Sequence, residues 1–195
     1  MAISDLLAQV RDCRECDQHL PLGPRPVLRA SAKARVVMIG QAPGTKVHNS
    51  GVPWNDASGD RLRDWLGMDR DTFYSTDRLA IIPMAFCYPG RASNGGDNPP
   101  RPECAPLWHG PLLEALPKLE LTLLIGSYAQ KYYLKKTAAK TMTETVRNWR
   151  NYLPGIVPTP HPSWRTTAWL RKNPWFEADV VPELRERLAN ALNKS

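Results

Sequence analysis

The chain has 195 residues, 42% of them hydrophobic and 23% charged, which fits one substantial hydrophobic core, so we predict a single domain over residues 1–195 with an N-terminal Cys-x2-Cys arm. A formal net charge of +7 and a pI near 9.4 favour a polyanionic partner such as nucleic acid. No stretch has the eighteen apolar residues of a membrane span or the pattern of an export signal, so we expect a cytoplasmic protein without membrane association.

The first half of the chain predicts one strand between two helices. A short helix is expected over residues 4–12 with Ser4 as its N-cap, followed by a loop over 17–33. The apolar run 34–40 predicts a buried parallel strand that ends in a glycine-containing turn over 41–44. A polar loop is then expected up to Ser58, which would cap a helix that continues to Leu66.

The second half repeats the alternation of strand and helix. Strands are predicted at 79–83, 121–126 and 155–159, and helices at 102–116, 127–134 and 175–193. This order predicts the α/β class, with a central parallel sheet flanked by helices. Ligands of such sheets bind beyond the carboxyl ends of the strands, so the loops expected to carry function are 41–57, 83–103 and 160–165.

The four cysteines predict a metal centre. Cys13 and Cys16 have the spacing that lets two thiolates bind one metal, and Cys87 and Cys104 supply a second pair across a long loop. The sixteen intervening residues differ from a compact zinc ribbon, so we favour an iron-sulfur cluster and keep zinc as the alternative. Free or buried thiols are the other interpretation; a thioredoxin-like pair is disfavoured because no strand precedes the motif.

Polar residues also collect in two of the predicted loops. The turn at 40–44 lacks the spacing of a nucleotide-binding glycine motif, so no nucleotide cofactor is expected. Downstream, His48, Asn55 and Asp56 surround Trp54 and offer bases, an amide and a stacking ring. His161 follows the last predicted strand, where its imidazole would lie at the edge of the sheet, although a lone histidine is often structural.

Five motifs follow one another along the chain: the N-terminal Cys-x2-Cys, Gly-x-Ala-Pro-Gly at 40–44, Gly-x-Pro-aromatic at 51–54, the later cysteine pair, and His-Pro-Ser at 161–163. In this order they resemble the uracil-DNA glycosylase superfamily, in particular its iron-sulfur branches, families 4 and 5. The resemblance spans nearly the whole chain. It implies an α/β fold with a parallel sheet, a 4Fe-4S cluster on the four cysteines, and excision of a base from DNA.

The resemblance also implies roles for individual residues. A flipped base would stack on Trp54, His161 would stabilise negative charge on the departing base, and Asp56, or else His48, would position water at the sugar. We favour Asp56, because residues 54–60 resemble the aromatic-to-Ser-Gly-Asp segment of the branch that uses an aspartate. The expected base-binding residues are Gln41, Ala42, Trp54, Asn55 and Ser163.

Two residues after the His-Pro-Ser motif are expected to contact DNA. Trp164 and Arg165 lie where relatives insert a side chain into the duplex, although an exposed loop is the alternative. Four basic residues near Trp149 and Trp175 could form a further surface that contacts phosphates, with a solvated helix face as the alternative; they are Arg147, Arg150, Arg171 and Lys172.

One departure from the family pattern concerns base recognition. Pro83 occupies the position of the asparagine that reads uracil in relatives, and proline has neither a side-chain amide nor a backbone N–H. The sequence therefore predicts a monomeric DNA glycosylase of base excision repair that hydrolyses the N-glycosidic bond of uracil or another deaminated or damaged base. The alternatives are a non-catalytic nucleic-acid-binding module that keeps the pocket, and a zinc or redox protein unrelated to DNA.

Overall fold

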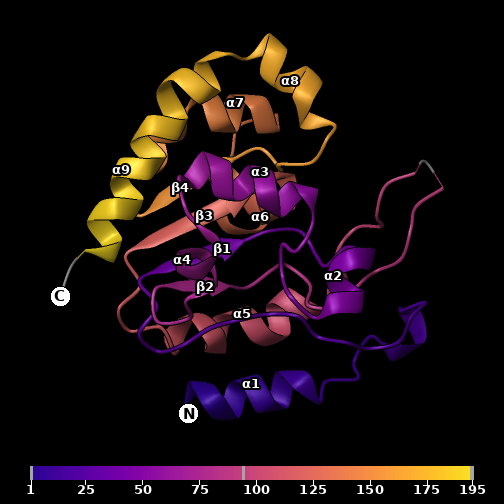
Figure 1. The fold of residues 1–195 in the computed structure, drawn as a ribbon. Coiled ribbons are helices and arrows are strands. Elements are labelled where there is room, and N and C mark those ends of the chain that lie inside the picture. The colour runs from indigo at the N-terminus through magenta and orange to yellow at the C-terminus, as the bar shows by residue number, and fades with distance from the viewer. Residues whose placement is uncertain (1, 94, 194–195) are drawn as a thin grey trace.

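The computed structural model describes residues 2–93 and 95–193 and has a central sheet of four parallel strands (Figure 1). The strands are β1 (Val36–Ile39), β2 (Leu79–Ile81), β3 (Leu121–Ile125) and β4 (Ile156–Thr159), in the spatial order β2-β1-β3-β4. Apart from one residue in each of β3 and β4, the strand residues are buried, which matches their continuous apolar sequences. The predicted α/β class with a parallel sheet is confirmed.

The strand order creates a switch point between β1 and β3. From β1 the chain passes to β2 on one side, and after β2 it returns to β3 on the other side, where Val36 is the partner of both Leu79 and Leu121. The loops that follow β1 and β3 therefore diverge at the carboxyl edge of the sheet. In open α/β sheets this divergence is where ligands bind.

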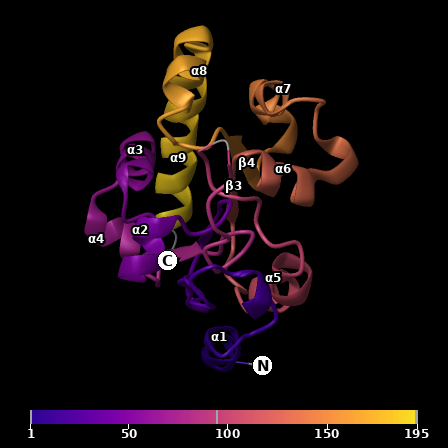
Figure 2. The same ribbon diagram turned by 90° about the vertical axis from the view of Figure 1, so that its right-hand side faces the viewer.

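Helices cover both faces of the sheet (Figure 2). Each face has its own hydrophobic core. Val36 and Met38 point to a core shared with α3 (Ala57–Leu66) and α9 (Val181–Leu192). On the opposite face the core contains residues of α1 (Ile3–Arg11), α5 (Cys104–Glu114) and α6 (Ser127–Leu134). This alternation along β1 follows from the two-residue period of a strand.

Shorter helical elements occupy the connections. They are α2 (Thr45–Ser50), α4 (Arg70–Tyr74), α7 (Met142–Arg147), α8 (Thr166–Lys172), the 3-10 turns Asp17–His19, Lys135–Thr137 and Trp149–Tyr152, and a π-helical turn at Phe176–Val180. Two expectations were therefore wrong. The segment before Ser58 contains α2, and the last predicted helix is divided into the π-helical turn and α9. Among residues 2–93 and 95–193, none of the helices combines the length and the hydrophobicity of a membrane span.

Both predicted N-caps are corrected by the structure. The first helix begins one residue earlier than expected, with Ala2 as N-cap and no capping side chain, so Ser4 lies inside the first turn. Helix α3 begins at Ala57, and its N-cap is Asp56, whose Oδ1 accepts a hydrogen bond from the Gly59 amide at 2.9 Å. Because an aspartate reaches the amide three residues later from an extended backbone, it caps the helix before Ser58 is reached.

Candidate active site and cysteine cavity

The turn after β1 forms one wall of the site at the switch point. Its first glycine, Gly40, lies directly against the indole of Trp54, because a Cβ atom added to Gly40 would be 2.7 Å from Cζ2 of that ring. Real Cβ contacts are essentially never this short, so only glycine allows the indole to approach the end of the strand. The glycine of the first motif therefore creates the seat of the aromatic ring.

The backbone of Trp54 is held in a strained conformation. Its φ of 56° lies in the left-handed region, which is uncommon for a bulky residue. The carbonyl of Trp54 accepts a hydrogen bond from the buried Arg63 at 3.4 Å, and Tyr74 donates to the preceding Pro53 carbonyl at 2.9 Å. Gly59 also leaves room for the carbonyl, since a Cβ there would be 1.7 Å from the Trp54 oxygen. Helices α3 and α4 thus fix the position of the ring.

The imidazole of His161 meets this ring from the other side of the switch point. His161 follows β4, and its ring centroid lies 5.5 Å from that of Trp54. Gly126, at the end of β3, packs against it with a positive φ of 84°, and a Cβ there would be 3.3 Å from the His161 Cβ. Thr166 donates a hydrogen bond from its hydroxyl to the His161 carbonyl and holds the loop.

His161 is uncharged at neutral pH. Burial lowers its pKa to about 4, and the negative charge of Asp56 offsets only part of this effect. A neutral imidazole donates one N–H. It can therefore stabilise negative charge that develops during a reaction without forming an ion pair with an anion in the ground state. Asp56 lies near enough to influence this ring, and the helix cap fixes the orientation of its carboxylate.

A hairpin whose described residues are 90–93 and 95–98 lies beside the turn after β1. Gln41 donates from Nε2 to the Asn98 carbonyl at 3.2 Å, so the side chain predicted to bind a base anchors this hairpin. The carboxylate of Asp97 lies over Gly44, with Oδ2 3.4 Å from the position of a Cβ on that glycine. Burial and the nearby Asp56 raise the pKa of Asp97, while Arg91 and Arg165 act in the opposite direction.

The outer rim of the site carries the two predicted DNA contacts. Trp164 is 74% exposed, the highest value among the exposed large hydrophobic residues of the described chain, and the Arg165 guanidinium lies 4.9 Å from its ring centroid. Arg61 of α3 donates to the Ser163 carbonyl at 2.8 Å and to Thr167 Oγ1 at 2.9 Å. This loop is therefore fastened to α3, and its tryptophan points into solvent.

The other predicted site residues have different surroundings. His48 lies in α2, is buried, and faces the ring of Tyr88 at 6.0 Å; burial and then Arg25 lower its pKa. Asn55 accepts a hydrogen bond from Arg70 at 3.2 Å through Oδ1. Ala42 lies in the turn after β1 and is partly accessible.

The basic residues expected to form a second surface are exposed, but one of their aromatic neighbours is not. Arg147 lies over the ring of Trp175 at 4.7 Å, and Arg150 lies over Trp149 at 4.2 Å. Trp149 is only 2% exposed and belongs to the core, so it is not free to stack on a nucleobase.

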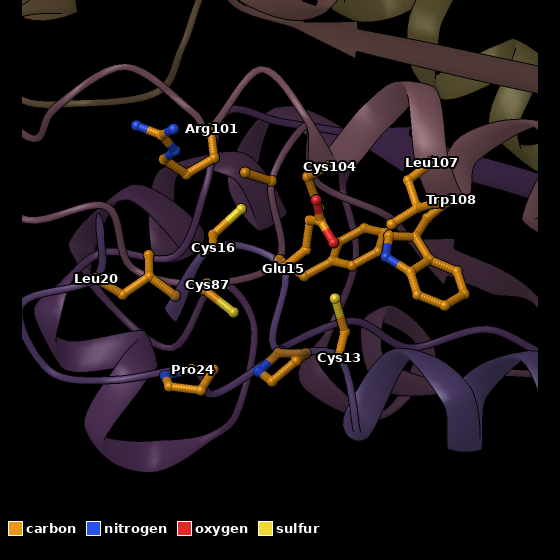
Figure 3. Close-up of a pocket in the computed structure, with 13 residues that line it drawn as sticks. Cys13, Glu15, Cys16, Leu20, Pro24, Cys87, Arg101, Cys104, Leu107 and Trp108 are labelled. Carbon is orange, nitrogen blue, oxygen red and sulfur yellow. The ribbon is translucent and has the colours of Figure 1, made fainter. Parts of the chain in front are cut away.

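The four cysteines line a single cavity, whose walls do not include Trp54 or His161 (Figure 3). Cys13 follows α1, Cys16 precedes a 3-10 turn, Cys87 follows β2, and Cys104 is the first residue of α5. Apolar side chains complete the walls, among them Leu20, Phe86 and Trp108. The walls of the cavity thus come from the N-terminal arm and from the residues that flank both ends of the 88–103 segment.

The cysteine side chains influence one another electrostatically. Burial raises the pKa of Cys87 to about 11 and that of Cys104 to about 12, and the charges of other cysteines add to both shifts. The Cys16 Sγ lies 3.9 Å from Oε2 of Glu103, and Oε1 of the same carboxylate pairs with Arg101 at 2.6 Å. In the described ranges no group of three or more His, Cys, Asp or Glu side chains has the arrangement of a metal-ion site. The donor set is nevertheless four thiols around one cavity, which fits a thiolate-ligated centre.

Sequence reasoning did not identify Asp97, Gly59, Arg61 or Arg63 as parts of the site. Gly59 had a usable signal, because it lies in the Ser-Gly-Asp segment of the family motif. Asp97 had none, since its proximity to Gly44 depends on how the long loop folds back.

The fold and site define an α/β protein with a ligand site at the switch point of its parallel sheet, where an aromatic ring, a neutral imidazole and a carboxylate meet. The chain belongs to the uracil DNA glycosylase superfamily, whose sequence pattern it matches over residues 29–185. This confirms the predicted resemblance. Of the predicted site residues, only Cys13 and Cys16 lie outside the matched region.

A curated relative adds a more specific similarity. The chain is 29% identical over 85 residues to a protein of Archaeoglobus fulgidus named type-4 uracil-DNA glycosylase. The match covers 42% of this chain and 43% of that relative, so less than half of the relative's length is spanned.

Proposed function

We propose that this protein is a DNA glycosylase that hydrolyses the N-glycosidic bond of a flipped uracil or other deaminated or damaged base. The observation that carries the proposal is the 5.5 Å separation of the Trp54 and His161 rings in a superfamily fold, with the Asp56 carboxylate near enough to affect the imidazole. The net charge of +7 and the exposed Trp164 beside Arg165 support DNA as the partner.

Trp54 would bind the flipped base by stacking. A base that leaves the duplex loses its stacking partners, and an aromatic face inside the pocket replaces part of that interaction. Because Gly40, Gly59 and Arg63 fix the indole before any ligand arrives, little ordering is required on binding.

His161 would stabilise the leaving base. Negative charge develops on the base as the bond to the sugar breaks, and a donor already in place at a carbonyl oxygen lowers the barrier. The low pKa keeps the imidazole neutral, so it donates one N–H without first attracting an anion. The loss of one such donor costs about 3 kcal/mol, or about 100-fold in rate.

Asp56 would act at the sugar. Its carboxylate would stabilise positive charge on the sugar ring and orient the water that attacks the anomeric carbon. The hydrogen bond from Gly59 engages Oδ1, which leaves Oδ2 for this water. His48 remains the alternative base, and its buried Nδ1 has no hydrogen-bond partner among the described residues.

Trp164 and Arg165 would contact the duplex. An exposed aromatic ring at the rim of the pocket can fill the space left by the flipped nucleotide. The fastening of this loop by Arg61 would hold the ring at a fixed height above the site.

We also propose that Cys13, Cys16, Cys87 and Cys104 hold a 4Fe-4S cluster, with zinc as the alternative. Such a centre would supply structural order by tying the arm to the 88–103 segment, and every chemical step above is assigned to other residues. Iron and acid-labile sulfide analysis of the purified protein, with a visible absorption band, would identify the cluster. Zinc in a colourless protein would contradict it.

A panel of lesion oligonucleotides tests the activity. The purified protein is incubated with duplex and single-stranded DNA that carries one uracil, hypoxanthine, xanthine or alkylated base, and abasic sites are then cleaved with alkali. We expect cleavage on at least one deaminated base. Asp56→Asn and His161→Ala should each slow excision by about 100-fold or more, whereas His48→Gln should have a small effect.

The results separate three interpretations. Binding of DNA that weakens with salt but yields no abasic product would favour a non-catalytic module. Unchanged excision by Asp56→Asn together with a large loss in His48→Gln would transfer the water-positioning role to His48. No binding and no cleavage by the protein with its metal centre intact would exclude a role in base excision.

A further inference from the structure

The hairpin formed by residues 90–93 and 95–98 brings an additional carboxylate to the candidate active site. Its two arms are joined by hydrogen bonds from Ala92 N to the Gly96 carbonyl at 2.7 Å and from Asn98 N to the Gly90 carbonyl at 2.8 Å. An antiparallel bridge between Arg91 and Asp97 continues the pairing. Asp97 therefore has a defined backbone position although it lies in a segment rich in glycine and proline.

The hairpin is bonded to one side of the site and lies close to the other. On one side the Gln41 amide donates to the Asn98 carbonyl at 3.2 Å, which links it to the turn after β1. On the other side Gly96 faces Arg165, since a Cβ on this glycine would be 3.2 Å from the guanidinium Nη1. The hairpin thus extends from the turn that seats Trp54 to the loop that carries His161.

The Asp97 carboxylate faces the turn after β1. Its Oδ2 lies 3.4 Å from the position of a Cβ on Gly44, and Asp97 as a whole is exposed, so its carboxylate is only partly desolvated. The charged groups that influence it are Asp56, Arg91 and Arg165. A ligand atom bound beside Gly44 would meet this carboxylate, which as an anion only accepts hydrogen bonds.

Base recognition at the family's usual position is not available in this chain. Pro83 has no side-chain donor or acceptor, and its carbonyl accepts a hydrogen bond from Nε2 of the buried His109 at 3.0 Å. The polar edge of a flipped base must therefore be read from another element. Asp97 supplies a carboxylate beside the glycine turn, since, apart from the chain neighbours of Gly44, its Oδ2 is the one atom of the described residues within 4 Å of a Cβ on that glycine.

A carboxylate at this place can distinguish a deaminated base from its parent. The ring nitrogen beside the deaminated carbon carries a proton in uracil and hypoxanthine, whereas the same nitrogen in cytosine and adenine is an unprotonated acceptor. A carboxylate accepts a hydrogen bond from the protonated ring nitrogen of the deaminated base and is repelled by the lone pair of the unprotonated nitrogen of the parent base.

We propose that Asp97 reads the ring N–H of the flipped base and so selects deaminated bases over their parents. This assignment depends on the proposed glycosylase function and adds a specificity determinant to it. Asp97 acts on binding and discrimination, while the bond-breaking step stays with Asp56 and His161.

A cycle that combines a protein variant with a modified base tests the proposal. Single-turnover excision rates are measured on hypoxanthine and N1-methylhypoxanthine, and on uracil and N3-methyluracil, with wild-type protein and Asp97→Ala. Methylation removes the N–H in each pair, so we expect a penalty of roughly 100-fold in the wild type. In Asp97→Ala the ratio of rates on the unmethylated and methylated base should fall below about tenfold. The variant has no carboxylate at this position, so removal of the N–H leaves no acceptor without a hydrogen bond.

A second variant and a control complete the experiment. Asp97→Asn can both accept and donate, so its preference for hypoxanthine over adenine should narrow by at least about tenfold. Asp5→Asn makes the same change of charge in α1, far from the hairpin (Figure 1), and should leave every ratio unchanged.

The outcomes distinguish the two proposals. A wild type that excises deaminated bases, with the same methylation penalty in Asp97→Ala, would overturn the role of Asp97 and leave the glycosylase function standing. A uniform loss of rate on all bases would likewise assign Asp97 a structural role. A wild type without activity on any deaminated base would overturn both.

Discussion

The packing of Trp54 against α3 predicts an unusual response to Gly59→Ala. An alanine inside a helix normally stabilises it by about 0.5–1 kcal/mol relative to glycine. At position 59, however, the new methyl group would be 1.7 Å from the Trp54 carbonyl oxygen and 2.9 Å from its Cβ. The first distance is far below van der Waals contact and involves backbone, so Trp54 must move together with the start of α3.

The effect of this movement on the free energy of unfolding can be bounded. Overpacking of a well-packed region costs about 1–3 kcal/mol, so the variant should be less stable despite its better helix propensity. For a chain of this size each kcal/mol corresponds to about 2–4 °C in Tm. Because the displaced residue is the proposed stacking ring, excision should fall by more than the loss of stability explains.

Urea denaturation and thermal melting of Gly59→Ala and of a matched control measure the effect. Gly110 is also a helical glycine, in α5, but has no atom within 4 Å of an added Cβ. Gly110→Ala should therefore gain about 0.5–1 kcal/mol. If Gly59→Ala is as stable as Gly110→Ala and retains full activity, the Trp54 backbone is not held as described, and the explanation for its positive φ is wrong.

The remaining predictions concern acid stability, DNA contact and the metal centre. Burial lowers the pKa of His109 from 6.5 to about 4, so the contribution of its neutral form to the free energy of unfolding is fully present above pH 6.5 and decreases by about 3 kcal/mol towards pH 4. Urea denaturation over a pH series should show a smaller decrease in His109→Gln than in the wild type. Equal pH dependence of the two proteins would contradict this. Trp164→Ala should leave Tm unchanged, because the ring is 74% exposed, but should weaken excision from duplex DNA by roughly tenfold and from single strands less; equal losses on both would argue against a wedge. Cys87→Ser should lose iron and visible absorbance, and full iron content would remove this residue from the ligands.

The sequence predicted the elements whose signals are local. The aliphatic runs of β1 and β3 gave buried parallel strands at nearly the observed bounds, and α6 was predicted with the observed bounds because Gly126 separates it from β3. The four cysteines were expected to converge, and they line one cavity. These features depend on hydrophobic periodicity and on residue types whose chemistry is restricted.

Local patterns misjudged the places where several residues compete for one structural role. Ser58 was expected to cap α3, but Asp56 lies two residues earlier and reaches the Gly59 amide from an extended backbone. The terminal helix was expected to be continuous, yet a π-helical turn precedes α9. Sequence preference identifies suitable residues, but the three-dimensional geometry selects among them.

The composition of the site, by contrast, was decided only by tertiary structure. The motifs named Trp54, Asp56 and His161, while the hydrogen bond from Gln41 to Asn98 joins residues 57 positions apart and brings Asp97 over Gly44. No periodicity or turn preference specifies such a contact, because it forms between loops whose path depends on the whole fold. The sequence therefore determined the strands, the family motifs and the candidate metal ligands, and the folded chain determined which carboxylates face the same site.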